Sequence, residues 1–256
     1  MGQMVLQITD CHLVRAGSKL LGMDTQASLE AVLTHAFTNL SVSGIVVTGD
    51  IAHTPQRAVY RRFFSTLKQF SDAPVLCLPG NHDVVAEMVA AGLPMAPLNL
   101  GAWSVVPLDS HIDDMPAADV SAQNCHDVRE AMTATAARHC LLATHHPLVA
   151  INSPWLDKDR IQNAAELLDS LRKPGPAGLA DKLRGIVFGH AHQEVFARLE
   201  RLPLFGTPST CFQFMPGSTG FTLDERPPGY RWLRLADNGR LSSDVCRVDF
   251  FPEQSK

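Results

Sequence analysis

The stretch Pro79-Gly80-Asn81-His82-Asp83 directly follows the apolar run Pro74-Val75-Leu76-Cys77-Leu78. A short apolar run that lies between prolines and leads into a glycine is typical of a buried strand ending in a sharp turn. Asn81, His82 and Asp83 are therefore expected at the carboxyl end of a strand. In open α/β sheets ligands bind at this edge, and these side chains can coordinate a metal, move a proton or orient a neighbour.

Four other short polar clusters repeat this placement at the ends of apolar runs. They are Asp10-Cys11-His12, Gly49-Asp50, His145-His146-Pro147 and Gly189-His190-Ala191-His192. Asp10 and His12 are two residues apart, so in an extended segment both side chains point to the same side and can chelate one ion. His190 and His192 repeat that spacing, and Asp50 offers two oxygens that could bridge two ions. Together the clusters predict one metal site.

Each cluster taken alone also has an ordinary structural explanation. An Asp after a strand is commonly a helix cap, and a lone His is commonly a hydrogen-bonded surface group. Five clusters in this order, each at the end of a predicted strand, favour a functional site. Four histidines outside the clusters are interpreted as solvated: His35, His111, His126 and His139. His53 could be either a solvated histidine or part of the site.

Apolar periodicity predicts alternating strands and helices in the first third of the chain. Strands are predicted at 4–9, 45–48 and 74–78, with a helix at 24–40 between the first two. A second helix is predicted to begin at Thr54-Pro55, as N-cap and first helical residue. This βαβαβ order implies parallel pairing and right-handed crossovers.

The rest of the chain changes from strand–helix units to strands and hairpins. A short helix is predicted at 84–91, closed by Gly92. The later elements are strands at 102–108, 140–144, 185–188, 195–199, 202–205, 230–235 and 245–250, helix with loop at 113–138, a helix at 160–172, a loop at 174–176 and a turn at Asn238-Gly239. Without repeats, 256 residues are ordinary for one domain, which we expect to span residues 1–256.

Composition narrows the class of partner and compartment. A hydrophobic content of 45% and a charged content of 19% are globular values, and a formal charge of -4 argues against nucleic acid or an anionic membrane. The six cysteines have no C-x-x-C spacing, which indicates buried, reduced thiols. The chain enters a predicted strand at once, and no apolar run approaches the roughly 20 residues of a membrane span. We expect a cytoplasmic protein of undetermined oligomeric state.

In this order, the five clusters resemble the sequence blocks of the calcineurin-like metallophosphoesterases. The flanking sequence is similar to the bacterial class III 3′,5′-cyclic-nucleotide phosphodiesterases, for example in Trp155-Leu156-Asp157, Pro208-Ser209-Thr210-Cys211 and Gln213-Phe214. The resemblance implies an α/β fold of four layers, an αββα sandwich in which two mixed sheets pack face to face with helices outside. It also implies hydrolysis of 3′,5′-cyclic AMP to 5′-AMP by a metal-dependent phosphoric diester hydrolase.

The resemblance further implies which residues carry the chemistry. It assigns one metal ion to Asp10, His12, Asp50 and His192, and the other to Asp50, Asn81, His145 and His190. His82 would be catalytic together with Asp50, stabilising developing charge or protonating the leaving 3′-oxygen. Substrate contacts are expected from His12, Asn81, His82 and His192. A nitrogen and oxygen ligand set without thiolate admits Fe, Mn, Zn or Co as the two divalent ions.

Some features depart from the resembling proteins or leave alternatives open. Protein phosphatases of the superfamily carry an Asp and a Glu where this chain has His53 and Asp83, so that activity is not expected, and the sequence does not show what orients His82. Residues 113–138 lack the glycine pattern expected of close relatives. Trp155 or Phe214 could stack on a nucleobase, but both could equally pack in the core.

Three other functions remain possible on the sequence alone. One is another phosphodiesterase on the same metal core, acting on glycerophosphodiesters or nucleic-acid ends. A metal-free interaction scaffold would be expected to lack ligands, and none of the expected ligands is missing. A structural zinc site would prefer thiolates and leave no use for His82.

Overall fold

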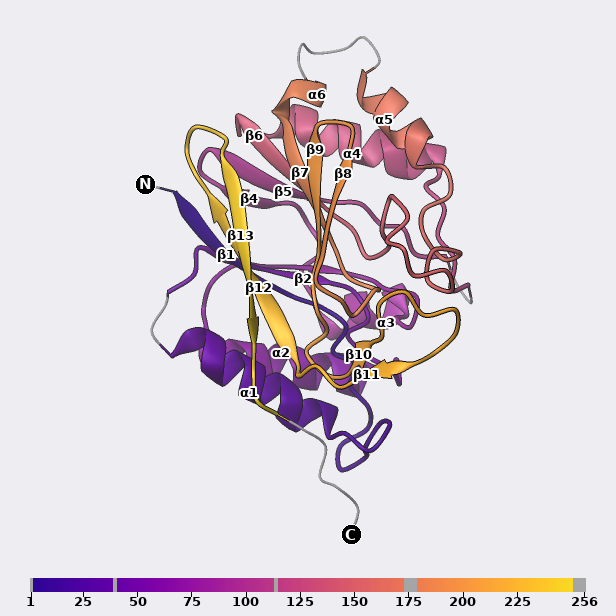
Figure 1. The fold of residues 1–256 in the computed structure, drawn as a ribbon. Helices are drawn as coiled ribbons and strands as arrows, with labels where there is room; N and C mark the ends of the chain where they lie inside the picture. The colour runs from indigo at the N-terminus through magenta and orange to yellow at the C-terminus, as the bar shows by residue number, and fades with distance from the viewer. Residues whose placement is uncertain (1, 39–40, 113–114, 173–178, 251–256) are drawn as a thin grey trace.

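Two mixed β-sheets lie at the centre of the protein in the computed structural model, which describes residues 2–38, 41–112, 115–172 and 179–250 (Figure 1). The first sheet has the strand order β13-β12-β1-β2-β3, and the second has the order β4-β5-β6-β7-β9-β8. A small hairpin pairs β10 with β11. Helices α1 and α2 lie on the outer side of the first sheet, and α4, α5 and α6 lie beside the second (Figure 1).

The first sheet is built mainly from the N-terminal third of the chain. Strands β1, β2 and β3 pair in parallel, and β12 joins β1 in the antiparallel direction. This confirms the predicted βαβαβ unit. The bounds are β1 Gln3–Ile8, α1 Thr25–Phe37, β2 Gly44–Thr48, α2 Arg57–Phe70, β3 Val75–Leu78, α3 Val85–Ala91, β12 Gly229–Leu235 and β13 Leu241–Arg247.

The second sheet is built from the middle of the chain. Strands β5, β6, β7 and β9 are parallel, while β4 and β8 pair antiparallel at its two edges. The bounds are β4 Leu98–Leu100, β5 Trp103–Pro107, α4 Ala122–Ala134, β6 His139–Ala143, α5 Ala164–Arg172, α6 Leu179–Lys182, β7 Leu183–Phe188, β8 Val195–Leu199, β9 Leu202–Gly206, β10 Gln213–Phe214 and β11 Leu223–Asp224.

Three clusters of buried apolar side chains lie between the four layers of the fold, which are two sheets with helices outside each. Strand β1 shows the principle, because successive side chains of a strand point to opposite faces. Leu6 and Ile8 pack with α1 and α2, whereas Val5 packs against side chains of the second sheet such as Trp103 and Val105. A third cluster joins the second sheet to α4 and α5. The predicted four-layer αββα fold is therefore confirmed.

The ends of several elements differ from the predictions: β13 spans Leu241–Arg247 where 245–250 was predicted, and α5 begins at Ala164 where 160 was predicted. Gly92 has a φ of 82°, the left-handed conformation expected of a helix-ending glycine. Helix α2 begins at Arg57 and not at Thr54-Pro55, because the N–H groups of His53 and Thr54 both donate to the Leu13 carbonyl and hold this segment outside the helix. Helix α1 ends at Phe37, and the predicted residues 39–40 lie outside the described residues, as do 113–114 and the loop at 174–176.

Two short elements and one histidine were not foreseen correctly. Strand β4 and helix α6 are three and four residues long, too short to show a period in sequence. His139 was expected to be solvated but is buried, with Nδ1 accepting from Arg184 Nε at 3.2 Å and Nε2 beside the Asp237 carbonyl at 3.2 Å.

Burial of the cysteines agrees with the expectation of reduced thiols. All six are free, and five are buried.

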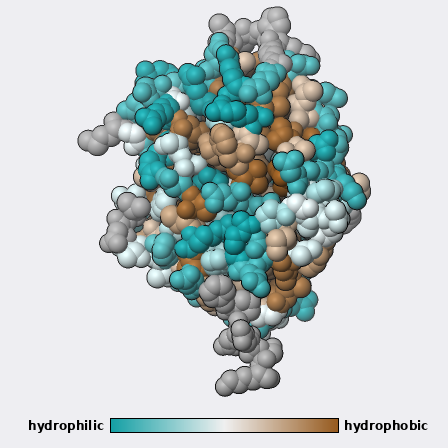
Figure 2. Space-filling model, viewed as in Figure 1, coloured by the Kyte–Doolittle hydropathy of each residue, from teal (hydrophilic) through white to brown (hydrophobic). Residues whose placement is uncertain are grey.

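No helix within the described ranges combines the length and apolar character needed to cross a bilayer. Hydrophilic and apolar side chains alternate over the face shown in Figure 2.

Candidate metal centre

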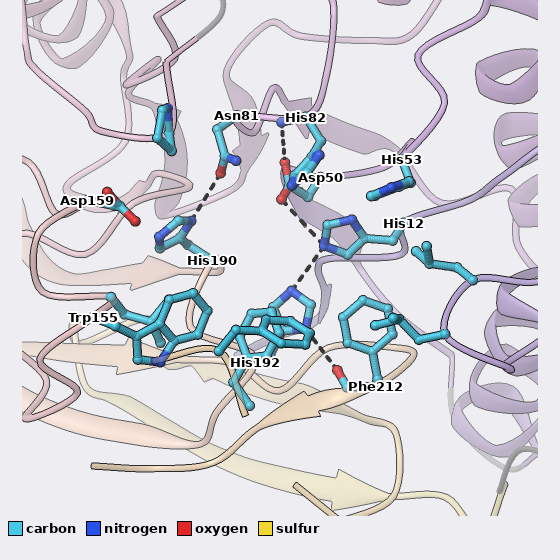
Figure 3. Close-up of a pocket in the computed structure, with 16 residues that line it drawn as sticks. His12, Asp50, His53, Asn81, His82, Trp155, Asp159, His190, His192 and Phe212 are labelled. Atoms are coloured by element: carbon cyan, nitrogen blue, oxygen red, sulfur yellow. Dashed lines mark hydrogen bonds and ion pairs between the residues drawn. The ribbon is translucent and has the colours of Figure 1, made fainter. Parts of the chain in front are cut away.

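The loops that follow five parallel strands meet at one edge of the two sheets. Asp10 and His12 follow β1, Asp50 follows β2, and Asn81 and His82 follow β3. From the second sheet, His145 follows β6, and His190 and His192 follow β7. The structure thus brings all seven predicted ligands and His82 into one site. Figure 3 shows His82 and the five of these ligands that line the cavity, which are His12, Asp50, Asn81, His190 and His192.

Four of the predicted ligands form a first group of donor atoms. His12 Nε2 lies 3.0 Å from His192 Nε2 and 3.5 Å from Asp50 Oδ2, and His192 Nε2 lies 3.4 Å from Asp10 Oδ1. Two donors that share an ion at about 2.1 Å, at angles of 90–110°, are about 3.0–3.4 Å apart. These separations fit the first predicted metal position.

The second group has the same spacing and shares Asp50 with the first. Asn81 Oδ1 lies 3.1 Å from both His145 Nε2 and His190 Nδ1, and Asp50 Oδ2 lies 3.6 Å from His145 Nε2. Asp50 Oδ2 is therefore within 3.6 Å of donors in both groups. This is the position that a bridging carboxylate requires.

Backbone carbonyls set the tautomer of two of these histidines. His145 Nδ1 lies 2.8 Å from the Thr48 carbonyl, and His192 Nδ1 lies 2.8 Å from the Phe212 carbonyl. A carbonyl only accepts, so each Nδ1 carries the proton and each Nε2 presents its lone pair to the cluster. Two ring nitrogens in the described site, His12 Nδ1 and His190 Nε2, are buried without a hydrogen-bond partner.

The backbone of the site is strained at several of the predicted ligands. Eight described residues other than glycine have positive φ, and five of them are predicted ligands. Such values cost of order 1–3 kcal/mol each and persist where the surrounding structure imposes them. The strained ligands, with φ between 43° and 61°, are Asp10, His12, Asp50, His190 and His192.

Three glycines make room for this arrangement. A Cβ at Gly80 would collide with the Asp50 side chain and its backbone nitrogen, and a Cβ at Gly189 would collide with Thr9 Oγ1. A Cβ at Gly49, whose φ is 92°, would come 2.5 Å from His145 Nδ1. The glycines of the sequence motifs are needed because the ligand loops touch one another.

Asp83 holds two of the ligand loops together without being a predicted ligand. Its buried carboxylate accepts from the N–H groups of Ile51, Ala52 and Gly80 at 3.0–3.1 Å and from Tyr60 Oη at 3.0 Å. Burial and the neighbouring Asp50 carboxylate raise the pKa of Asp83 to about 7, although the Gly80, Ala52 and Ile51 N–H groups lower it. Asp83 thereby joins the loop after β2 to the loop after β3.

Neighbouring rings and Asp50 orient His82, which the sequence could not show. The His82 backbone N–H donates to Asp50 Oδ1 at 2.9 Å. Its ring stacks on His53, with centroids 5.0 Å apart and an angle of 30°, and meets the His12 ring edge-on at 5.0 Å. His53 thus belongs to the site, and both His53 and His82 are exposed to the cavity.

Burial favours the neutral form of two of the predicted ligand imidazoles, which is the form that binds metal. Burial lowers the pKa of His12 and of His190 well below the usual value, and neighbouring histidines add to the effect. At His145 burial also lowers the pKa, but the Asp50 and Asp10 carboxylates outweigh it and the net shift is upward. The carboxylates and imidazoles therefore form a cluster suited to hold positive charge.

A cavity of about 390 Å³ opens onto this cluster. The Phe214 ring stacks on His192, with centroids 4.1 Å apart and an angle of 24°, and Trp155 meets Phe214 edge-on at 5.1 Å. Both aromatics thus line the cavity, while Phe214 is also buried against a ligand. Phe212, Phe221 and Asp159 complete this side, and no Lys or Arg occurs among the described residues that line the cavity.

His146 supports the cluster from behind. It is buried beside His145 and His190, with Nδ1 2.9 Å from Ser110 Oγ and Nε2 3.1 Å from the Pro116 carbonyl. Pro116 lines the cavity. Sequence reasoning missed this role and those of Tyr60, Phe212 and Asp159, because no local motif distinguishes them.

Two facing mixed sheets with such a cluster at the strand ends define a metallophosphoesterase. This chain belongs to the calcineurin-like phosphoesterase family, whose model matches residues 4–194. The predicted family resemblance is thus confirmed. The family uses divalent metals, in agreement with the His and Asp clusters of the structure.

Full-length relatives are described as cyclic AMP phosphodiesterases. The 3′,5′-cyclic adenosine monophosphate phosphodiesterase CpdA of Pseudomonas aeruginosa is 38% identical over 252 residues, covering 96% of this chain and 90% of the relative. CpdA of Escherichia coli K12 is 34% identical over 255 residues, covering 95% and 89%.

Solved structures agree in fold at low sequence identity. TT1561 of Thermus thermophilus matches with a TM-score of 0.60 at 12% identity, covering 95% of this chain and 99% of the other. PhoD matches with a TM-score of 0.61 at 10% identity, covering 97% and 70%. At this identity the likeness shows the fold alone.

Proposed function

We propose that this protein is a metal-dependent phosphodiesterase that hydrolyses 3′,5′-cyclic AMP to 5′-AMP. The observation that carries the proposal is one cluster of seven donor side chains beside an aromatic-walled cavity of about 390 Å³. That volume lies within the range of small-molecule sites. The choice of cyclic AMP rests on the relatives described as CpdA, which span nearly the whole chain.

The proposed centre holds two divalent transition-metal ions, Fe, Mn, Zn or Co. Asp10, His12, Asp50 and His192 would hold one, and Asp50, Asn81, His145 and His190 the other. The donor spacing of 3.0–3.6 Å supports this division. When bound, such a pair lowers the pKa of a water and offsets charge on phosphoryl oxygens.

The remaining chemistry belongs to side chains that face the cavity. We assign to His82 the protonation of the leaving 3′-oxygen, because its ring is exposed to the cavity and packs against the His53 and His12 rings. His12, Asn81 and His192 also line the cavity, and they would contribute to phosphate binding by holding the ions that face the substrate. The tethered leaving oxygen stays on the ribose, so the product is a 5′-monophosphate.

The cavity chemistry favours a small substrate with a single negative charge. Without Lys or Arg among its described lining residues, attraction for the phosphate comes only from the metal end. Trp155 offers an aromatic face, and stacking of a base is worth about 1–3 kcal/mol. Asp159 would accept a hydrogen bond from a ribose or base donor and would repel a second phosphate.

We extend the proposal to the remaining properties of the chain. Residues 1–256 would form a single domain that acts in the cytoplasm on a free nucleotide and not on nucleic acid. The net charge of -4 and the six free cysteines support this.

Two substitutions test the division between ligand and catalytic residue. Asp50→Ala should remove both ions and all turnover, since it opens both groups. His82→Ala should retain its metals and lose about 10²-fold or more in kcat. Metal content measured by elemental analysis beside cyclic AMP turnover decides both, and loss of metal from the His82 variant would refute its assigned role.

A substrate panel tests the choice of nucleotide. Cyclic AMP, cyclic GMP, a glycerophosphodiester and an aryl phosphodiester should be compared by kcat/KM at equal metal loading. Cyclic AMP is expected to be the best biological substrate. A higher kcat/KM for the glycerophosphodiester than for both cyclic nucleotides would refute cyclic AMP as the substrate, while the assignment as a phosphodiesterase would stand.

A further inference from the structure

We propose that His53 and His82 form a third transition-metal site at the cavity, separate from the two ions of the main centre. One ring nitrogen from each of His12, His53 and His82 lies within 4.8 Å of the other two. The His53 and His82 rings stack at 5.0 Å, and both are exposed. In Figure 3 they lie at the end of the site that is remote from Trp155 and Asp159.

The distances allow both exposed imidazoles to reach one ion. Two donors bound to the same ion at about 2.1 Å are at most about 4.2 Å apart. Separations within 4.8 Å therefore need side-chain rotations that shorten them and turn the lone pairs of the two stacked rings toward one point, and exposed rings can make such rotations. His53 forms no part of the main centre, since the seven predicted ligands there are complete without it.

His12 supplies an independent reason to expect a ligand here. Its Nε2 points to His192 and Asp50, whereas its Nδ1 is buried without a hydrogen-bond partner and lies on the side of His53 and His82 (Figure 3). With Nε2 bound in the main centre, Nδ1 carries the proton and needs an acceptor. A water bound to an ion between His53 and His82 would accept that hydrogen bond.

The two ligands determine which ions the site would take. Neutral imidazole suits Zn²⁺, Ni²⁺ and Cu²⁺, whereas Mg²⁺ and Ca²⁺ prefer oxygen ligands. With two protein ligands and water in the other positions, the site should be weaker than the main centre. It should therefore fill only when the two main ions are already in place.

Occupation of this site would inhibit the enzyme, a consequence that rests on the proposed function. An ion held by His82 occupies the lone pair that the ring needs to exchange a proton with the substrate. Activity should thus rise as the main centre fills and fall when Zn²⁺ is in further excess, while excess Mg²⁺ should not inhibit.

The binding test does not depend on turnover. Zn²⁺-loaded protein, freed of excess metal and shown to hold its tight ions, is titrated with further Zn²⁺ in a calorimeter. The parent should bind one additional ion, and His53→Gln and His82→Gln should each lose it while keeping the tight ions. His126→Gln is the matched control, because His126 is an exposed histidine on α4, and it should retain the additional ion.

The inhibition test uses the same Zn²⁺-loaded parent and His53→Gln proteins. The Zn²⁺ concentration for half inhibition, relative to each protein's own maximal rate, should rise at least tenfold in His53→Gln. An additional ion that persists in both variants, or no additional ion in the parent, would overturn the site. If binding follows the expectation but the half-inhibition concentrations agree, the site stands and its inhibitory role falls.

Discussion

Replacement of Asp83 by Asn tests how the ligand loops are held in place. The Asp83 carboxylate accepts four hydrogen bonds, from Ile51, Ala52, Gly80 and Tyr60. Asn keeps the size and shape but turns one oxygen into an amide nitrogen, which faces N–H donors in either orientation. At least one backbone N–H then remains buried without an acceptor.

The expected loss follows from this count. A buried donor left without a partner costs about 1–3 kcal/mol, and with the weaker neutral acceptor we expect a total of about 2–4 kcal/mol. For a chain of this size each kcal/mol lowers Tm by about 2–4 °C, so Tm should fall by roughly 4–16 °C. Metal affinity should fall about 10–100-fold, since Asp83 fixes the loops that carry Asp50 and Asn81.

Thermal unfolding with metal and after chelation separates the two effects. The Tm loss should persist in chelated protein, because the hydrogen bonds of Asp83 do not require an ion. Tyr60→Phe is the control: it removes one of the four bonds and the acceptor of the Val84 N–H, but it keeps the three backbone N–H bonds of Asp83, so it should cost about 1–2 kcal/mol and leave metal affinity nearly unchanged. An Asn variant with the Tm and metal affinity of the parent would refute the role of Asp83.

Two further substitutions test the packing of the site and the buried His139. Gly80→Ala should abolish metal binding because its Cβ would collide with Asp50, whereas Gly220→Ala, with nothing within 4 Å, should be neutral by metal content and Tm. Burial lowers the pKa of His139, and the nearby Arg184 lowers it further. Below the pKa of a free histidine, the unfolded chain therefore binds a proton at His139 more readily than the folded protein does. The free energy of unfolding should therefore fall as the pH drops below about 6.5. Urea unfolding at pH 5.5 and 7.5 should show a smaller fall in His139→Gln than in the parent. An equal fall in both proteins would contradict the role of His139.

Order and spacing along the chain determined the parts of this protein that depend on local chemistry. The apolar runs before Asp10, Asp50 and Asn81 alternate with helical patterns, and this βαβαβ order predicts parallel strands. The ends of such strands share one edge, so the same runs predict that these side chains meet. The Gly-Asn-His-Asp and Gly-His-x-His motifs also carry the family resemblance that the comparison confirmed.

Only the tertiary structure decided what depends on contacts between distant segments. The acceptor role of Asp83 needs the loop after β2, the stacking of His53 on His82 joins two loops, and the burial of His139 needs the β12–β13 turn at Asp237 and Gly239. The sequence marks Asp83 as part of a motif, but it does not show the partners of Asp83, His53 or His139, because those partners lie tens of residues away. A sequence motif can name a ligand, but the geometry that holds it is set by the long-range packing of the two sheets.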